Sequence, residues 1–305
     1  MQNILLISYS QSGQLNEIID NFLIPFDNSC IDRINIIPKK PFPFPFKSKE
    51  FFDLMPETVF EEEIQLEPIV FKSINYDLII IGYQPWYLSP SLPISSLFYN
   101  KNFTSLLKEK PVVTIIGARN MWLNSQESIK DHIYNAGGNL VANIPLIDKH
   151  NNLISVVTIL YWMLTGKKQR YLNLFPFPGV SQNDINESYI FGEVVFNAFK
   201  ENSYNNLQNK ILALNKIKIT TEILFIEQRA KKIFKIFALL IKKEGTSLKK
   251  RAFLINIFKY YLLIALFIVA PIILLFFNLF FLPFQKRSIQ RKKEYFCNIK
   301  RIEEC

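Results

Sequence analysis

The chain has 305 residues, a length that suits one large domain with an appendage, and its 36 Lys+Arg against 26 Asp+Glu give a net charge of +10. The basic excess lies wholly in residues 201–305, which hold 20 Lys+Arg and 7 Asp+Glu, whereas residues 1–200 carry a net charge of −3. This distribution excludes a uniformly basic chain and leaves two partners for the last third, nucleic acid or an anionic membrane surface.

The first predicted element is a strand that leads into a turn rich in hydroxyl groups. The strand covers Ile4–Ser8, and a helix is predicted to begin at about residue 14. The first N–H groups of a helix are unpaired and its dipole adds positive charge, so such a turn binds anions. The turn has neither a GxGxxG nor a GxxxxGK[ST] motif, and serines stand where those motifs have glycines. It therefore favours a single phosphate monoester such as that of FMN, and the candidate ligands are Ser10, Gln11, Ser12, Gly13 and Gln14.

Strand-like apolar runs alternate with helix-like segments as far as about residue 144. The predicted strands are Ile4–Ser8, Arg33–Ile37, Asp77–Ile81, Val112–Ile116 and Leu140–Ile144. The predicted helices are Gln14–Phe22, Ser96–Leu107 and Leu123–Asn135, the last with a C-cap at Gly137-Gly138. Four strands are continuous apolar runs, typical of buried parallel strands, and the mixed second strand is predicted at an edge. The pattern predicts an open α/β sheet whose ligands bind beyond the carboxyl ends of the strands.

Two later loops follow the third and fourth predicted strands and would share that carboxyl edge with the first turn. They span residues 82–90 and 117–122. The rings of Trp86 and Tyr87 either flank a flavin ring or pack beneath their loop. Arg119 either lies near the flavin or the substrate, or it is a charge on the protein surface. Asn120 has a simpler alternative as a turn residue. The candidate cofactor residues of the two loops are Gln84, Pro85, Trp86, Tyr87, Gly117, Ala118 and Asn120.

Four further segments complete the folded part of the chain. The proline-rich stretch Pro38–Phe46 is predicted to be an extended loop, because proline removes donors and fixes φ, and its Phe side chains either pack on the domain or form a substrate wall. Residues 153–165 form a strongly apolar helix that is short for a membrane span. A helix around Ile185–Phe199 closes the domain, and residues 206–243 form one long helix that becomes basic.

A long apolar run near the C-terminus indicates which partner the basic region has, nucleic acid or an anionic membrane surface. Residues 260–284 contain no charge, and about 20 apolar residues cross a bilayer core. Basic residues flank the run on both sides, so the positive-inside rule gives no orientation. The run is either one tilted span or a shallow hairpin broken at Pro271 with both ends in the cytoplasm. Membrane lipid is therefore the expected partner, and nucleic acid is disfavoured.

The N-terminus and the cysteines indicate a reducing, cytoplasmic location. Residues 1–7 lack the charged and apolar regions of a signal peptide. Cys30, Cys297 and Cys305 have no metal-binding spacing and are expected to be free thiols. We expect the catalytic domain on the cytoplasmic side of the inner membrane, and no metal.

Two of these motifs resemble the flavodoxin-like family. They are the turn Ser10-x-Ser12-Gly13 and the loop Gly82–Tyr87. The family pattern of the turn is [ST]-x-[ST]-G-x-[ST], and here Leu15 replaces the last hydroxyl, so either phosphate binding is weaker or Gln14 compensates. The resemblance covers about residues 1–200 and implies a five-stranded parallel sheet in the order 2-1-3-4-5 with bound FMN.

A closer resemblance is carried by five segments, and it is to the bacterial dialkylresorcinol condensing enzyme family. The segments are YSQSGQL, PFPFPF with EFFD, GYQPWYLSPS, GARNMW and DKHNNLISVVT. The family accompanies a separate ketosynthase in making dialkylresorcinols and flexirubin-type pigments. Condensation needs an activated cysteine paired with His or Asn, which this sequence does not show. The resemblance therefore implies flavin-dependent aromatisation of a 2,5-dialkylcyclohexane-1,3-dione, a lipid-like substrate, to the resorcinol.

That reaction needs a proton acceptor and a group that stabilises an oxyanion. His150 is the candidate base, with a structural or capping role as its alternative, and Arg119 is the candidate cation. His132 is expected to be exposed on a helix. Two other functions stay open: a non-catalytic flavodoxin-like scaffold that holds the ketosynthase at the membrane, and a general NAD(P)H:quinone reductase.

The predicted division of the chain is into four parts. They are a flavodoxin-like domain at 1–200, a basic helical linker at 201–251, a transmembrane or re-entrant segment at 252–284 and a basic cytoplasmic tail at 285–305.

Overall fold

A five-stranded parallel sheet forms the centre of the molecule. The computed structural model describes residues 3–26 and 29–301, so Cys305 and the first two residues lie outside the described part. The strands are hydrogen-bonded in the order β2-β1-β3-β6-β7, which in order of these five along the chain is 2-1-3-4-5, the flavodoxin-like order. Their bounds are β1 (Asn3–Ser8), β2 (Cys30–Asn35), β3 (Leu78–Tyr83), β6 (Pro111–Ala118) and β7 (Asn139–Ile147). The predicted fold class is confirmed.

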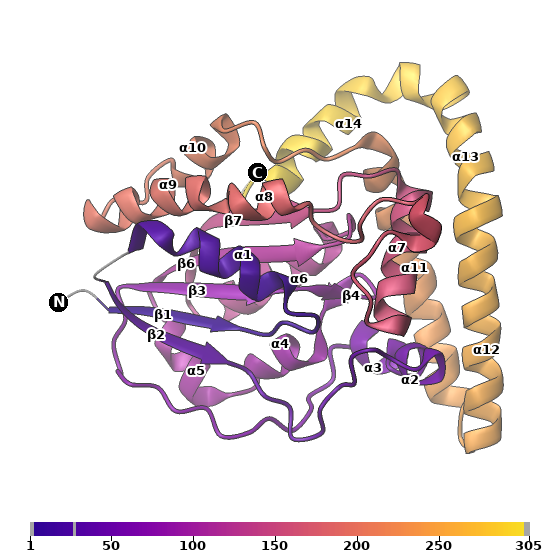
Figure 1. The fold of residues 1–305 in the computed structure, drawn as a ribbon, viewed down its shortest axis with the longest axis horizontal. Coiled ribbons are helices and arrows are strands. Elements are labelled where there is room, and N and C mark those ends of the chain that lie inside the picture. The colour runs from indigo at the N-terminus through magenta and orange to yellow at the C-terminus, as the bar shows by residue number, and fades with distance from the viewer. Residues whose placement is uncertain (1–2, 27–28, 302–305) are drawn as a thin grey trace.

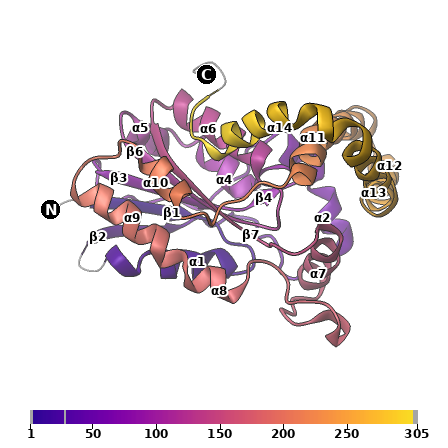
Figure 2. The same cartoon turned by 90° about the horizontal axis from the view of Figure 1, so that it is seen from above.

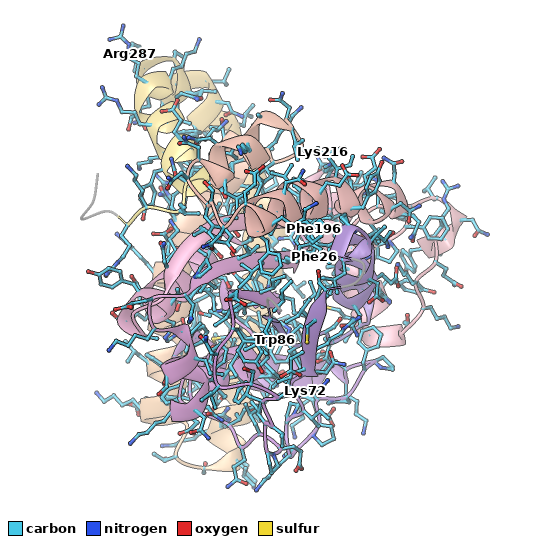
Figure 3. The ribbon with its side chains drawn as sticks, turned by 90° about the vertical axis from the view of Figure 1, so that its left-hand side faces the viewer. Phe26, Lys72, Trp86, Phe196, Lys216 and Arg287 are labelled. Atoms are coloured by element: carbon cyan, nitrogen blue, oxygen red, sulfur yellow. The ribbon has the colours of Figure 1, made fainter. Side chains whose placement is uncertain are left out.

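Helices cover both faces of the sheet, because its central strands are apolar on both sides (Figures 1 and 2). One face packs against α1 (Gln14–Phe22), α8 (Gln182–Asn186), α9 (Ser188–Lys200) and α10 (Leu207–Ala213). The other packs against α4 (Leu92–Leu97), α5 (Lys101–Leu107) and α6 (Leu123–Asn135). Phe26 also meets Phe196 of α9 (Figure 3). Their ring centroids are 5.0 Å apart.

Capping residues explain why some helices have the bounds predicted from the sequence and others do not. Helices α1 and α6 have the predicted bounds, and the backbone of Gly138 donates to Ile133 at 2.9 Å to close α6. The helix expected at 96–107 is wrong as one element: the Asn100 side chain accepts from the Phe103 N–H and starts α5 anew. The helix expected at 206–243 is likewise divided, because Thr220 caps α11 (Thr221–Glu244).

The second strand begins and ends earlier than its sequence pattern indicated, at Cys30 and Asn35, and it lies at the sheet edge as expected. The buried Asp32 explains its mixed composition, because its carboxylate accepts from the Tyr76 hydroxyl at 2.5 Å and from the Lys72 N–H at 2.8 Å. The proline-rich loop contains no helix in its described residues and anchors itself through the buried Phe46.

All five strands point toward a set of helices that closes the carboxyl edge of the sheet (Figure 1). The short hairpin β4 (Pro85–Trp86) and β5 (Ser89–Pro90) lies at this edge. The closing helices are α2 (Ser48–Asp53), α3 (Met55–Val59), α7 (Asn152–Thr165), α11 and α12 (Leu248–Ile264).

The apolar C-terminal run continues α12 as one long helix, Leu248–Cys297, that is long and apolar enough to cross a membrane. A π-helical turn over Ala265–Val269 leads into α13 (Ala270–Phe276), so the helix passes through Pro271 without a break. The break at Pro271, which belonged to the hairpin alternative, is therefore not observed. The change of direction follows a second π-helical turn, Phe277–Phe281, after which α14 (Leu282–Cys297) runs back to the domain (Figure 1).

The contact between α9 and α1 offers a test of this packing. A Cβ added to Gly192 would lie 1.9 Å from the carbonyl oxygen of Phe22, a backbone atom that cannot move aside. Gly192→Ala is expected to lower the free energy of unfolding by about 1–3 kcal/mol, measured by urea denaturation. The exposed Asn197 of the same helix supplies the control, because Asn197→Ala should be neutral or slightly stabilising. Equal stability of both variants would contradict the observed packing.

Candidate functional site

A cavity of about 420 Å³ lies at the carboxyl edge of the sheet, and the three predicted loops meet in its wall. The predicted residues that line it are Gln11, Ser12, Gln14, Gln84, Pro85, Trp86, Tyr87, Gly117, Ala118 and Arg119. Ser10 and Gly13 belong to the same first turn but not to the lining, and neither Asn120 nor His150 borders the cavity. The topology therefore brings together segments that are more than 100 residues apart in the chain.

The first turn keeps its anion-binding features. Gly13 is the N-cap of α1 and has a left-handed φ of +85°, and no side chain caps the helix. In the described part of the chain, the buried Ser10 hydroxyl has no hydrogen-bond partner. An uncapped helix N-terminus beside an unpartnered hydroxyl is suited to a phosphate group.

The glutamines of the turn are engaged in structural contacts. The Gln14 side chain exchanges two hydrogen bonds with the backbone of Val180, at 3.1 and 3.0 Å, so only its backbone is left for a ligand. The Gln11 amide donates to the carbonyls of Phe42 and Pro43, and its N–H donates to Gln84 Oε1 at 3.3 Å. These bonds brace the turn against two neighbouring loops.

Leu15, the departure from the family pattern, is only 2% exposed and belongs to the core between α1 and the sheet. A Cβ added to Gly117 would lie 3.4 Å from Leu15 Cδ1. Leu15 therefore packs beneath Gly117 at the start of the third loop. The Gln14 side chain is bonded to Val180 and does not replace the hydroxyl that Leu15 lacks.

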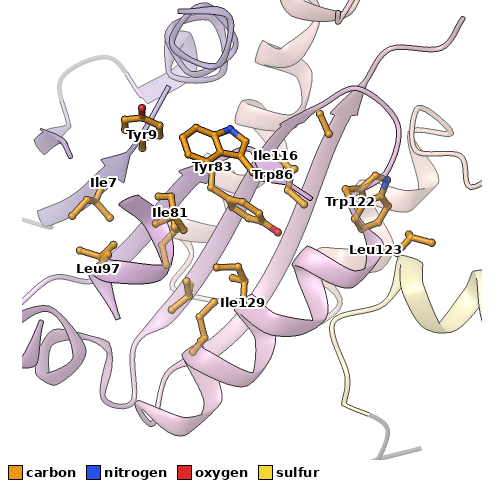
Figure 4. Close-up of a cluster of buried hydrophobic side chains, with 14 of the residues drawn as sticks. Ile7, Tyr9, Ile81, Tyr83, Trp86, Leu97, Ile116, Trp122, Leu123 and Ile129 are labelled. Atoms are coloured by element: carbon orange, nitrogen blue, oxygen red, sulfur yellow. The ribbon is translucent and has the colours of Figure 1, made fainter. Parts of the chain in front are cut away.

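The two aromatic residues of the second loop diverge into different clusters. Trp86 is buried and meets Tyr9 edge-to-face (Figure 4). It meets Phe42 and Phe46 in the same way. Tyr87 has a φ of +47° and donates its hydroxyl to the Phe51 carbonyl at 2.7 Å. Both rings pack beneath the loop and also border the cavity, so both sequence interpretations hold in part.

Arg119 is the cation of the third loop in the cavity wall, which also includes Arg229 of α11. Its Nη1 donates to Asn152 Oδ1 at 2.7 Å and to Ser155 Oγ at 3.0 Å. None of the ion pairs among residues 3–26 and 29–301 includes it. Burial lowers the pKa of Arg119 to about 10, although Asp148 and Glu227 act to raise it, so the group stays charged at neutral pH. The alternative of a surface charge is wrong, and the guanidinium is free to pair with a ligand oxyanion.

Asn120 belongs to the same polar network and is more than a turn residue. It is 5% exposed, and its Nδ2 donates to Asn152 Oδ1 at 3.0 Å. Its Oδ1 is buried without a partner among the described residues.

His150 is held by a carboxylate at the end of β7. Its Nδ1 lies 2.7 Å from Oδ1 of the buried Asp148, which fixes the ring orientation and leaves Nε2 for proton transfer. The His150 side chain is 41% exposed. His132 is half-buried rather than exposed, because its Nε2 lies 2.8 Å from Glu61 and its ring stacks on Phe98.

Sequence reasoning missed two carboxylates at this edge. Asp148 could have been suspected from its position two residues before His150 in a strand-end loop. Glu227 gave no signal, since it lies in a basic amphipathic helix. It is fully buried, and its Oε1 accepts from the Asn124 N–H at 2.8 Å in the first turn of α6. Its Oε2 has no partner in the described chain.

The far end of the cavity is apolar and was also missed. Its walls come from α7, α11, α12 and α13, through side chains such as Val156, Trp162, Phe225, Ile233, Leu266 and Ile273. The cavity thus joins a polar end at the sheet to an apolar end at the C-terminal helices.

Comparisons with known proteins add the following. No family model matches the chain, and no curated protein does. A flavoprotein from Lactobacillus acidophilus, solved in complex with FMN, is 18% identical with a TM-score of 0.36 over 48% of this chain and 93% of that one. Flavodoxin 1 from Bacillus cereus is 13% identical with a TM-score of 0.34 over 63% and 95% of the two chains. A flavodoxin from the domain Archaea is 13% identical with a TM-score of 0.33 over 65% and 99%. Because these identities and TM-scores are low, the fold is assigned from the observed strand order.

The buried carboxyl of Glu227 predicts a pH-dependent stability. Burial raises the pKa of Glu227 from 4.5 to about 7. Between these values the folded state binds a proton that the unfolded state has lost, so stability falls as the pH rises through this range. Glu227→Gln should raise the free energy of unfolding at pH 8 by about 2–3 kcal/mol and have little effect at pH 4. Glu244→Gln, at the exposed end of α11, is the control. An equal effect of Glu227→Gln at both pH values would contradict the assignment.

Proposed function

We propose that the protein is a membrane-attached, FMN-dependent oxidoreductase that acts on a lipid-like substrate. One observation carries this proposal: a single cavity connects the uncapped phosphate turn to a wall of apolar helices. The family resemblance of the sequence narrows the reaction to the aromatisation of a 2,5-dialkylcyclohexane-1,3-dione in dialkylresorcinol or flexirubin-type biosynthesis. The proposed location is the cytoplasmic side of the inner membrane, with a ketosynthase as partner.

The residues of the site fit FMN. Ser12 and the N-terminus of α1 would hold the phosphate, with the unpartnered Ser10 hydroxyl in the same turn, and the backbone at Gly117 would border the ring. When bound, FMN supplies a hydride acceptor. Aromatisation removes two hydrogens from the dione. Bound FMN would accept one as a hydride and a base of the chain would accept the other as a proton, so the reaction would balance.

The chain supplies the oxyanion and proton contacts. The guanidinium of Arg119 borders the cavity without a carboxylate partner, and it would stabilise the enolate oxygen formed as the dione loses its proton. His150 is the proposed proton acceptor at Nε2, positioned by Asp148. It lies two residues before Asn152, which holds Arg119, and outside the cavity lining. The apolar end of the cavity would take the alkyl chains.

A non-catalytic scaffold is the second candidate. It is favoured by the missing hydroxyl at Leu15 and by the structural contacts of Gln11 and Gln14, which leave fewer groups for a phosphate. A quinone reductase would share the flavin site, and turnover of simple quinones with NADPH in place of diones would identify it.

The phosphate turn is tested by a charge placed where the phosphate would bind. The wild-type protein should bind FMN and absorb near about 450 nm. Ser12→Asp should weaken FMN binding at least about tenfold, measured by fluorescence titration, because like charges repel at the helix N-terminus. Ser181→Asp adds the same charge at the N-cap of α8 and should bind FMN normally. Wild-type protein that takes up no FMN would favour the scaffold.

Arg119 is tested in the FMN-loaded protein with a dialkylcyclohexanedione, by following the resorcinol product by mass. Arg119→Gln is expected to lower kcat by about 10²–10³ with FMN affinity unchanged, because a fixed cation facing the oxyanion is lost. Arg170→Gln, at an exposed position, should retain wild-type kcat. Unchanged turnover by Arg119→Gln would remove Arg119 from the reaction.

A further inference from the structure

The outer face of the long C-terminal helix is a continuous apolar surface. No charge lies between Lys259 and Lys286. The large apolar side chains exposed along this stretch are Tyr260, Ile264, Phe267, Ile268, Val269, Ile272, Ile273, Leu275, Phe276, Leu279, Phe280, Phe281 and Phe284. Phe284 is 88% exposed and Leu279 is 62% exposed. Such a surface marks an interaction site, since soluble monomers rarely expose apolar patches of this extent.

The start of this helix is bound to the folded domain. Arg251 Nε donates to Asp53 at 2.8 Å, and its Nη2 lies 2.9 Å from Glu57. Lys259 Nζ donates to Ser48 Oγ at 3.2 Å. These partners belong to α2 and α3 at the carboxyl edge of the sheet.

The end of the helix is bound to the same domain. The Gln208 side chain of α10 donates to the Cys297 carbonyl at 2.7 Å, and Arg301 pairs with Asp131 of α6 at 3.2 Å. Figure 1 shows the resulting arch, which leaves the domain along α12 and α13 and returns along α14. Figure 3 shows Arg287 on this arch, away from the sheet.

These contacts exclude a single crossing of a bilayer. A crossing helix separates its two ends by a hydrocarbon core of about 30 Å, yet both ends here bind one folded body. Helix α11 also packs along α12, with the rings of Phe234 and Phe258 5.3 Å apart, and it exposes Lys232 and Lys235. A perpendicular α12 would draw these lysines into the hydrocarbon.

Basic residues stand at both ends of the apolar surface. Lys249 and Lys250 precede it, and Lys286, Arg287, Arg291 and Lys292 follow it, all exposed. None of the ion pairs among the described residues includes Lys286 or Arg287. Exposed cations beside an apolar surface complement the phosphates of an anionic lipid leaflet.

We propose that α12, α13 and the first turns of α14 form a monotopic anchor that lies in one leaflet of an anionic membrane, with both basic ends on the side of the domain. The inner face of the same helix lines the cavity through Leu266 and Leu274, so the anchor holds the cavity beside the lipid. The anchor itself is independent of the proposed flavin chemistry.

The topology is tested with full-length protein that carries a single cysteine at one of three positions. The native Cys30 is exposed and marks the side of the domain, while Thr246→Cys and Ser288→Cys mark the two ends of the anchor. The other cysteines are changed to serine. In right-side-out and inside-out membrane vesicles, a membrane-impermeant maleimide should label all three positions in the same vesicles. Labelling of Thr246→Cys and Ser288→Cys in opposite vesicles, or labelling of either only after detergent, would overturn the proposal.

A second measurement examines the lipid contact without the cysteine changes. The full chain should cosediment with vesicles of phosphatidylcholine and phosphatidylglycerol, and the pair Lys286→Glu and Arg287→Glu should weaken binding at least about tenfold. The exposed pair Lys39→Glu and Lys40→Glu is the matched control and should keep most of the binding. A dimer that forms without detergent and does not cosediment with vesicles would show that a second copy covers the apolar face. That result would overturn the proposal.

Discussion

The packing of α11 across the carboxyl edge of the sheet is the contact on which the site depends. Glu227 enters the first turn of α6 and accepts its Asn124 N–H at 2.8 Å, in the place where a local capping residue would otherwise serve. The neighbouring Phe225 and Ile233 form cavity wall, and Phe234 reaches α12. Helix α11 therefore joins the carboxyl edge of the sheet to the long apolar helix Leu248–Cys297. This packing buries the carboxyl group of Glu227, which lowers the free energy of unfolding when the group is charged.

This arrangement separates two tasks along one cavity. The sheet end presents Ser12 and the uncapped N-terminus of α1 at Gln14, together with the cation Arg119, which has no ion-pair partner among the described residues. The helix end presents mainly apolar walls, with Arg229 of α11 as its cation, and is formed in part by the proposed lipid anchor. A substrate with a polar ring and alkyl chains would satisfy both ends, which is the physical basis of the proposed function.

The sequence predicted what depends on local patterns. The bounds of α1 and α6, the strand order and the meeting of the three loops follow from apolar runs, a glycine cap and the rule that parallel strands share their carboxyl edge. It did not predict single capping side chains or the contact of Glu227 with a distant segment. Asn100 and Thr220 interrupt helices through side-chain caps, and Glu227 is recognisable only once its buried partner Asn124 is known. Asp148 was missed although it stands two residues before His150. Pro271 indicated a break, but the helix continues through it after a π-helical turn over Ala265–Val269.

The connection between the two ends of the cavity is the central claim, and photo-crosslinking measures it most directly. The probe is a dialkylcyclohexanedione with a diazirine at the end of one alkyl chain, added to the full-length, FMN-loaded protein and irradiated before peptides are mapped by mass spectrometry. The predicted label falls on α12 and α13, around Leu266 and Ile273, while the ring occupies the end near Arg119. A label found only outside the cavity walls, or one that excess unlabelled dione does not displace, would contradict the claim.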